Sequence, residues 1–178
     1  ELSRNLSDKS PPITTTTPRL AHYDPGVPAE INPEEYSSLA DLLDQSFKQF
    51  AQRDMASFMG VHWTFSQIDE MSNAMAAWLQ AQGLAKGARV ALMMPNVPQY
   101  VVAIAAVLRA GYVVVNVNPL YTPRELEHQL KDSGAEAIVI LENFATTLQE
   151  VVARTPIKRI VLASMGDMLP FLKGTLVN

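Results

Sequence analysis

The sequence feature that most constrains the fold is an alternation of buried strands and amphipathic helices between Arg89 and Leu141. Three short apolar runs, at 89–94, 112–117 and 137–141, lack the polar alternation of a half-exposed strand. Such runs are typical of strands that are covered on both faces. The segments between them have the length and spacing of helices. We therefore predict parallel strands that are joined by right-handed crossovers.

The two intervening helices carry start and stop signals. Pro98 can open the first helix, because the N–H that proline lacks would have no partner there, and Gly111 can close it in the left-handed conformation. Thr122-Pro123-Arg124-Glu125 has the form of a capping box with proline at the first helical position. Gly134 can end the second helix.

Two more elements are expected before this block. An amphipathic helix is predicted over about 39–53, with Ser38 and Asp41 as its cap pair. The apolar segments on either side of Gly60, within 55–65, indicate a hairpin with a tight turn.

A further helix is predicted from Ser66 to Gly83, with Ser66 and Asp69 at cap spacing. Its methionine and tryptophan positions could line a ligand pocket, but core packing is favoured because they share a helical stripe with other apolar residues. The stripe consists of Ile68, Met71, Met75, Trp78 and Leu79.

The expected fold class is α/β, with a layered, mainly parallel sheet and flanking helices. After the central block we predict a helix over 143–152 and a strand over 159–163. Residues 1–33 are expected to be a mobile or extended arm, in which 1–19 is polar and could be added sequence. Residues 34–178 are expected to form one α/β subdomain that is incomplete by itself.

Composition narrows the function classes. A chain of 178 residues with 48% hydrophobic residues can bury a core, and its net charge of −4 gives no electrostatic reason to expect nucleic acid. The absence of cysteine removes disulfides, thiolate metal sites and cysteine nucleophiles. No apolar run reaches the roughly 20 residues of a membrane-spanning helix.

Candidate catalytic groups are few. The sequence has no Gly-rich phosphate loop, no Gly-x-Ser-x-Gly and no histidine pair at metal spacing. His22, His62 and His128 are isolated, and for His128 a solvated helix face is favoured over a catalytic base, which would need positioned partners. Glu34-Glu35 is read as a solvated approach to the first helix, since adjacent carboxylates are not held across a substrate.

The loops that follow the strands are the expected place for a ligand on an open parallel sheet. Asn96 could cap the next helix or touch a ligand, and the cap is favoured because Pro98 follows. Asn118 and Tyr121 have the same two alternatives, with turn formation as the default. The loop after the third strand begins with Glu142-Asn143.

Several segments resemble the adenylate-forming superfamily. WTFSQI at 63–68 is similar to its first core motif, and LRAGYVVVNVNP at 108–119 is similar to its second. VPAEINPEEYSSL, RVALMMPNVPQY and VNVNPLYTPRELEHQLKDSGAEAIVI together resemble bacterial long-chain fatty acid:CoA ligases. The similarity runs from about Tyr23 to the end, whereas 1–19 matches no segment of the family.

The resemblance implies an ATP-dependent, AMP-forming ligase of fatty acid metabolism. Its substrate carboxylate attacks the α-phosphate of ATP, with Mg²⁺ balancing the phosphate charge, to give an acyl-adenylate and pyrophosphate. The thiolate of coenzyme A then displaces AMP. The resemblance also implies a homodimer in the bacterial cytoplasm, where a fatty substrate allows transient peripheral contact with the inner membrane.

The family's phosphate loop, its Tyr-Gly-x-Thr-Glu segment, its ribose-binding aspartate and its mobile-domain lysine do not occur in this sequence. We therefore assign no catalytic, cofactor-binding or metal-binding residue, and we expect the chain alone to be inactive and to bind ATP, coenzyme A and Mg²⁺ weakly at most. It would be the opening subdomain of the large amino-terminal domain. As a cut domain it should expose apolar surface and self-associate or be marginally stable.

Two other hypotheses remain open. The chain could be a non-catalytic binding or oligomerisation module with a ligase-like fold. It could also be a self-contained doubly wound nucleotide-binding domain, although the missing Gly-rich turn counts against this.

Overall fold

The structure, a computed structural model, describes residues 22–170, so the predictions for 1–19 lie outside it. The chain divides into two compact units, Glu1–Tyr36 and Ser37–Asn178. The described part of the first unit consists of turns. The Val27 N–H donates to the Asp24 carbonyl at 3.1 Å, and the Glu34 N–H donates to the Asn32 side-chain oxygen at 3.1 Å. These turns follow from the density of proline, glycine and asparagine.

The second unit is built on a four-stranded parallel sheet in the order β4-β3-β5-β6. Its strands are β3 (Arg89–Met93), β4 (Val113–Asn116), β5 (Ala137–Leu141) and β6 (Arg159–Ala163). In the register, Ala91 lies between Val115 and Ile138. The predicted fold class, strand positions and parallel pairing are confirmed.

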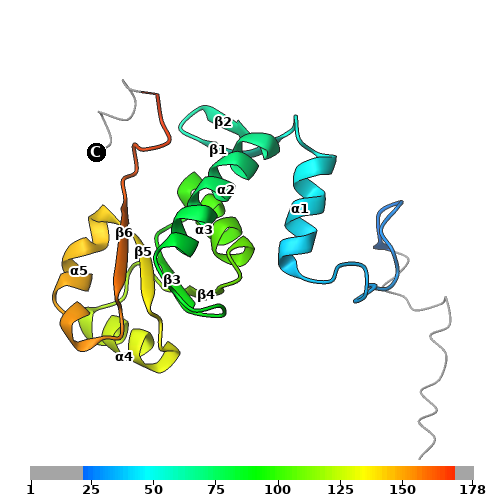
Figure 1. The fold of residues 1–178 in the computed structure, drawn as a ribbon. Helices are drawn as coiled ribbons and strands as arrows, with labels where there is room; N and C mark the ends of the chain where they lie inside the picture. Colours follow the sequence, from blue (N-terminus) through cyan, green and yellow to red (C-terminus); the bar gives the residue numbers. More distant parts are fainter. Residues whose placement is uncertain (1–21, 171–178) are drawn as a thin grey trace, which may run out of the picture. The chain divides into compact units, whose positions relative to one another are not determined.

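Helices cover both faces of this sheet (Figure 1). One face carries α2 (Phe65–Ala81) and α3 (Pro98–Arg109), whereas the other carries α4 (Pro123–Ser133) and α5 (Ala145–Gln149). This layering explains why the strands show no polar alternation, since each face needs apolar side chains.

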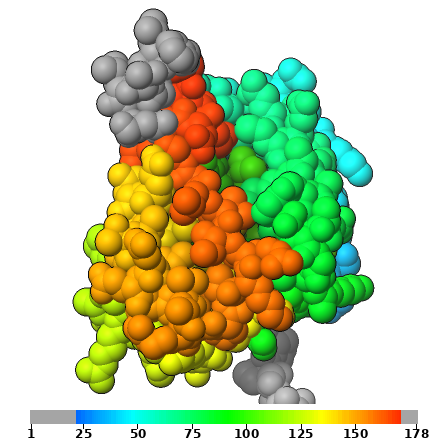
Figure 2. Space-filling view, turned by 60° about the vertical axis from the view of Figure 1, so that its left-hand side comes forward, coloured from blue at the N-terminus to red at the C-terminus, as the bar shows by residue number. Residues whose placement is uncertain are grey.

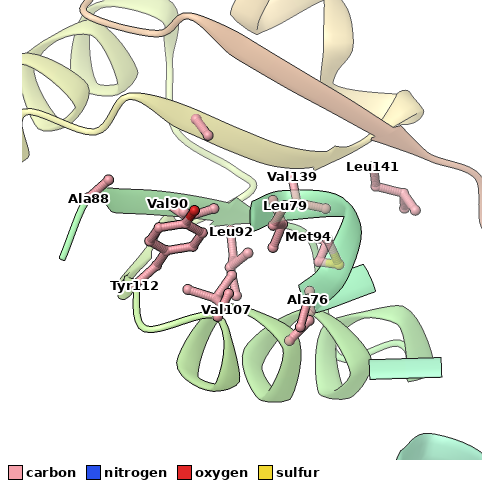
Figure 3. Close-up of a cluster of buried hydrophobic side chains, with 14 of the residues drawn as sticks. Ala76, Leu79, Ala88, Val90, Leu92, Met94, Val107, Tyr112, Val139 and Leu141 are labelled. Atoms are coloured by element: carbon pink, nitrogen blue, oxygen red, sulfur yellow. The ribbon is translucent and has the colours of Figure 1, made fainter. Parts of the chain in front are cut away.

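β3 divides its side chains between two buried clusters. Val90 and Leu92 point toward the α2 and α3 layer, where they meet Val107 and Tyr112 (Figure 3). The residues that alternate with them, Ala91 and Met93, pack with Leu126 and Leu130 of α4 on the opposite face. All four strand side chains are fully buried.

A third cluster joins the hairpin to the helices. Phe47 of α1 (Leu39–Gln49) and Trp63 of β2 (Val61–Thr64) pack with Ile68 of α2 and Val102 of α3. β2 pairs antiparallel with β1 (Asp54–Phe58). The connecting residues Met59 (φ 50°) and Gly60 (φ 70°) are both left-handed, as a two-residue type I′ hairpin turn requires. The predicted hairpin is confirmed.

One arginine ties the three helices of this layer together. Arg109, at the end of α3, is 10% exposed and forms ion pairs with Asp44 of α1 and Asp69 of α2. Its guanidinium also donates to the Ser72 hydroxyl at 2.8 Å and lies 4.6 Å from the centre of the Phe47 ring.

Most helix boundaries agree with the predictions. Thr122 and Glu125 form a reciprocal capping box at α4, and Gly134 ends that helix with φ 63°. Pro98 is the first residue of α3, and Gly111 follows its end with φ 81°. Ser38 caps α1 by accepting the Asp41 N–H at 3.1 Å.

The predicted cap of α2 was wrong. The helix begins two residues earlier, where Thr64 and Gln67 form a complete capping box, and not at Ser66 and Asp69. The box spacing of Thr-x-x-Gln satisfies two N–H groups as β2 runs directly into the helix. Core packing was also wrong for Trp78, which is 44% exposed. The buried face follows Ile68, Ser72, Ala76 and Leu79, so Trp78 lies at its margin.

Two helices are shorter than predicted. α1 ends at Gln49, because Phe50 leaves the helical conformation with its ring 5.6 Å from that of Phe65. The helix predicted over 143–152 is confined to α5, between 3-10 turns at Glu142–Phe144 and Val152–Arg154. Val151, buried in the α4 and α5 layer, has φ −122° and interrupts the helix there.

Candidate functional site

The carboxyl edge of the sheet is the place that this topology offers to a ligand. The chain leaves β3 toward α3 on one face and leaves β5 toward α5 on the other face. Because β3 and β5 are neighbours, the strand order reverses between them, and open α/β sheets bind ligands at such a switch point. The loops at this edge are 94–97, 117–122, 142–144 and 164–167.

Asn96, the first candidate, does not cap α3. The N-cap residue is Val97, which makes no side-chain cap bond, so the favoured cap was wrong. The Val97 N–H instead donates to the Pro95 carbonyl at 2.8 Å, and this tight turn takes the capping position from Asn96. Asn96 is exposed and lines a hollow of about 300 Å³ beside Ser57 and Tyr100.

The end of β4 is held by a hydrogen-bonded network. The Tyr100 hydroxyl donates to the Asn116 side-chain oxygen at 2.7 Å, which joins the start of α3 to the strand. The Gln129 amide of α4 donates to the Asn116 carbonyl at 2.9 Å. Asn116 is thus engaged from both helical layers, and the network fixes the strand end rather than presenting a reactive group.

Asn118 and Tyr121 form the turn that their default interpretation predicted. The Asn118 side-chain oxygen accepts the Leu120 N–H at 3.0 Å, and its carbonyl accepts the Tyr121 N–H at 3.1 Å. The Tyr121 side chain is half-buried and packs against the α4 layer. Turn formation is therefore confirmed for both residues.

Ser164 directly follows β6 and was not among the predicted site residues. It forms hydrogen bonds with polar groups from three segments of the chain. Its hydroxyl donates to the Glu142 carboxylate at 2.6 Å, and its N–H donates to the Asp167 carboxylate at 2.7 Å. The Gln99 amide of α3 donates to the Ser164 carbonyl at 2.8 Å. No sequence motif marks this cluster, since its members are separated by up to 68 positions and only the sheet order unites them.

The three histidines lie on different parts of the chain. His22 is exposed in the first unit, and His128 is exposed on α4, as its solvated-face interpretation predicted. The Nδ1 atom of His62 lies 2.9 Å from the Asp54 carboxylate across the hairpin, with both side chains more than half exposed. Glu34 and Glu35 are likewise exposed.

Charge near α4 has a structural role. Arg154 and Lys131 both hydrogen-bond to the Glu127 carboxylate and lower its pKa to about 2. The Thr122 N–H and hydroxyl lower the pKa of Glu125, which is the capping carboxylate of the same helix. These perturbed carboxylates stabilise the start of α4 and its contact with Arg154.

The described residues do not fit a nucleotide or a metal ion. Within 22–170, no three histidine, cysteine or acidic side chains are grouped so that they could hold a metal ion. Several amide and hydroxyl groups of the carboxyl edge bond to other protein groups, and the sequence of its loops contains no Gly-rich turn. Within 22–170, the hydrogen bonds of this edge thus join β4, β6 and the start of α3 to one another.

Comparison with known proteins identifies the lineage. The AMP-binding enzyme family matches residues 43–176, well over half of the sequence. The chain belongs to this family. A long-chain-fatty-acid–CoA ligase of Escherichia coli O157:H7 is 56% identical over 160 residues, which are 89% of this chain and 28% of that protein. The Bacillus subtilis ligase of the same name is 38% identical over 159 residues, again 28% of its length.

Solved structures agree on the fold. A long-chain-fatty-acid-CoA ligase from Archaeoglobus fulgidus superposes with a TM-score of 0.66 and 28% identity, over 80% of this chain and 30% of that one. An anthranilate CoA ligase superposes with a TM-score of 0.67 at 21% identity, over 71% of this chain and 25% of the ligase, which shows the shared fold alone. This AMP-binding family chain spans about 28% of the curated relatives that it matches. Among residues 22–170, no helix is both long and apolar enough to cross a membrane.

Proposed function

We propose that this chain is the amino-terminal part of a long-chain fatty acid:CoA ligase. The whole enzyme would convert a fatty acid, ATP and coenzyme A into acyl-CoA, AMP and pyrophosphate, with Mg²⁺ as the metal. The observation that carries the proposal is the 56% identity to a long-chain-fatty-acid–CoA ligase across 89% of the chain.

In this proposal the 178-residue chain is a structural scaffold that lacks the residues that carry out catalysis. Its described residues offer no fit for ATP or Mg²⁺, and the polar groups at its carboxyl edge bond to one another. We therefore derive no catalytic step from these residues. Their role in the whole enzyme is to fix the sheet that later segments extend.

A ligase activity assay can distinguish the complete enzyme from the 178-residue chain. The test is to express the complete reading frame and the 178-residue chain, and to measure acyl-CoA, AMP and pyrophosphate formation with palmitate, ATP, Mg²⁺ and coenzyme A. The complete protein should form all three products in equal amounts, and the 178-residue chain should form none. A complete protein that turns over benzoate but not palmitate would contradict the substrate class. Turnover by the 178-residue chain would contradict its assignment as a scaffold.

The proposed assembly and location go beyond activity. We propose a homodimer in the cytoplasm that contacts the inner membrane transiently while it takes up its substrate. Light scattering of the complete protein would test the dimer, and co-sedimentation with phospholipid vesicles, with and without palmitate, would test the membrane contact. A monomer at all concentrations, or no sedimentation in either condition, would contradict the respective statement.

A non-catalytic binding or oligomerisation module is the second candidate, and the outer strand favours it. β6 pairs with β5 on one side, and its side chains Ile160 and Leu162 are 46% and 59% exposed. Exposed apolar side chains on an edge strand favour association. A stop codon after Asn178, together with concentration-dependent self-association that Leu162→Lys abolishes, would support this module over the ligase.

A further inference from the structure

A hollow of about 220 Å³ lies between α2, α3 and β6, and the loop after β6 borders it through Asp167. Figure 2 shows a depression on this side of the molecule, between the green atoms of α2 and the orange to red atoms of β6 and the segment after it. Its lining is mostly apolar and includes Met71, Met75, Val102, Ala103, Val139 and Val161. The two polar residues of the lining are Gln99 and Asp167, and the Asp167 carboxylate already accepts the Ser164 N–H.

One polar side chain in this lining has an unmet hydrogen bond. Gln99 is 8% exposed, and its Oε1 atom is buried without a partner. The orientation of the amide is fixed by its other end, since Nε2 donates to the Ser164 carbonyl at 2.8 Å and to the Met165 carbonyl at 3.3 Å. A flipped amide would place oxygen against two carbonyl oxygens. Gln99 lines the hollow, so a fixed acceptor without a partner lies beneath the surface of its wall, and a hydrogen-bond donor would satisfy it.

Size and chemistry together restrict what can bind. The hollow is smaller than the roughly 300–1,000 Å³ of sites for drug-sized ligands, and somewhat larger than the cavity of about 150 Å³ that holds benzene in an engineered protein. A ligand must therefore be compact, about one ring with a substituent. The apolar lining disfavours a charged ligand, and the unmet acceptor favours one O–H or N–H group.

Three methionines make the wall adjustable. Met71, Met75 and Met168 all line the hollow, and their unbranched side chains change shape at low cost. This matters because Gln99 Oε1 is closed to solvent, so a ligand must displace a side chain to reach it. Gln129 has a similar unpaired oxygen but is less buried and has no such apolar surroundings.

We propose that this hollow binds a compact neutral molecule of the phenol or small-alcohol class, whose single donor bonds to Gln99 Oε1. The apolar body of the ligand packs against the methionines and against the valines of β5 and β6. The inference goes beyond the ligase function and does not depend on it, because it rests on residues of this chain alone.

Phenol and toluene are suitable probes, since they share a shape and differ in the donor. Each is titrated into the 178-residue chain while NMR follows the methionine methyl groups and the Gln99 side-chain amide. Both probes should shift the methyl signals of Met71, Met75 and Met168 saturably, and only phenol should shift the Gln99 amide. Absence of binding by phenol, or saturable shifts confined to methionines elsewhere, would overturn the proposal.

Substitutions then separate the donor bond from packing. Gln99→Met removes the acceptor at similar length, so it should weaken phenol binding about three- to tenfold and leave toluene binding unchanged. Ala163→Leu narrows the hollow and should abolish binding of both probes, whereas the matched control Ala153→Leu, at an exposed position, should leave both intact. Equal losses for both probes with Gln99→Met, or unaltered binding with Ala163→Leu, would refute the site. If Gln99→Met does not fold, the Gln99 amide signal of the unaltered chain tests the hydrogen bond instead. A shift of this signal by phenol but not by toluene would support the bond, and equal shifts by both probes would refute it.

Discussion

Arg109 is the residue whose removal should most clearly reveal how the hairpin and helix layer is held. Its guanidinium bonds to Asp44 at 2.7 Å, to the Ser72 hydroxyl at 2.8 Å and to the Asp69 carbonyl at 3.1 Å, and it covers the Phe47 ring. The substitution Arg109→Met keeps most of the apolar stem and removes the charge. It breaks contacts among three helices at once.

The size of the effect follows from the burial of each partner. Removing one member of a buried ion pair costs about 3–5 kcal/mol, because the other charge stays buried and unpaired. Here the two carboxylates are 49% and 38% exposed, so water can replace part of the lost interaction. The Ser72 hydroxyl, which is fully buried, loses a partner that water cannot replace. We therefore expect Arg109→Met to lower the free energy of unfolding by about 2–3 kcal/mol.

Urea unfolding, followed by circular dichroism, measures this change. Arg124→Met, at an exposed position on α4, is the matched control and should change the free energy of unfolding by less than about 0.5 kcal/mol. A double-mutant cycle with Asp44→Asn should show coupling, since the two side chains are in direct contact. A loss below about 1 kcal/mol for Arg109→Met, or strict additivity with Asp44→Asn, would refute this account of the layer.

Three further predictions concern packing, capping and charge. Leu126→Ala, in the fully buried α4 layer, should lower the free energy of unfolding by about 2–5 kcal/mol in urea titrations, whereas Leu120→Ala, at a position that is 82% exposed, should have little effect. Thr64→Ala should cost about 1 kcal/mol through the lost cap of α2, and Ser66→Ala should cost less than half as much; equal costs would contradict the observed cap. The Glu127 carboxylate has its pKa lowered from 4.5 to about 2, so its ion pairs stabilise the folded state above pH 4.5 and lose this contribution as the pH falls from 4.5 through 2. Glu127→Gln should therefore remove part of the acid sensitivity of the melting temperature in that window, and parallel profiles for the two proteins would count against the pairs.

The central block was predictable because its signals are local and agree with one another. Unbroken apolar runs identified β3 and β5, and the capping box at Thr122 fixed the start of α4 within one residue. The start of α2 was predicted less accurately, because two residue pairs there have the spacing of a helix cap. Ser66 and Asp69 have cap spacing, but Thr64 and Gln67 have it too, and the end of β2 decides between them.

The arrangement of polar groups at the carboxyl edge was not predictable from the chain. Ser164, Glu142 and Gln99 meet only because β6 lies next to β5 and α3 covers the adjoining face, and no sequence spacing encodes that meeting. Trp78 illustrates a different limit of sequence-based prediction. Helical periodicity predicted that it would lie on the buried face of α2, but the face that packs against the core is narrower than the apolar stripe, and Trp78 is exposed beside it. Periodicity gives the direction of a helix face, and only packing gives its extent.

The central claim, that this chain opens a fatty acid:CoA ligase, is tested most directly by sequencing the reading frame beyond Asn178. The account predicts an in-frame continuation into a Ser/Thr/Gly-rich phosphate loop with a lysine, followed by a Tyr-Gly-x-Thr-Glu segment. A stop codon close to Asn178, or a continuation without a phosphate loop, would contradict it.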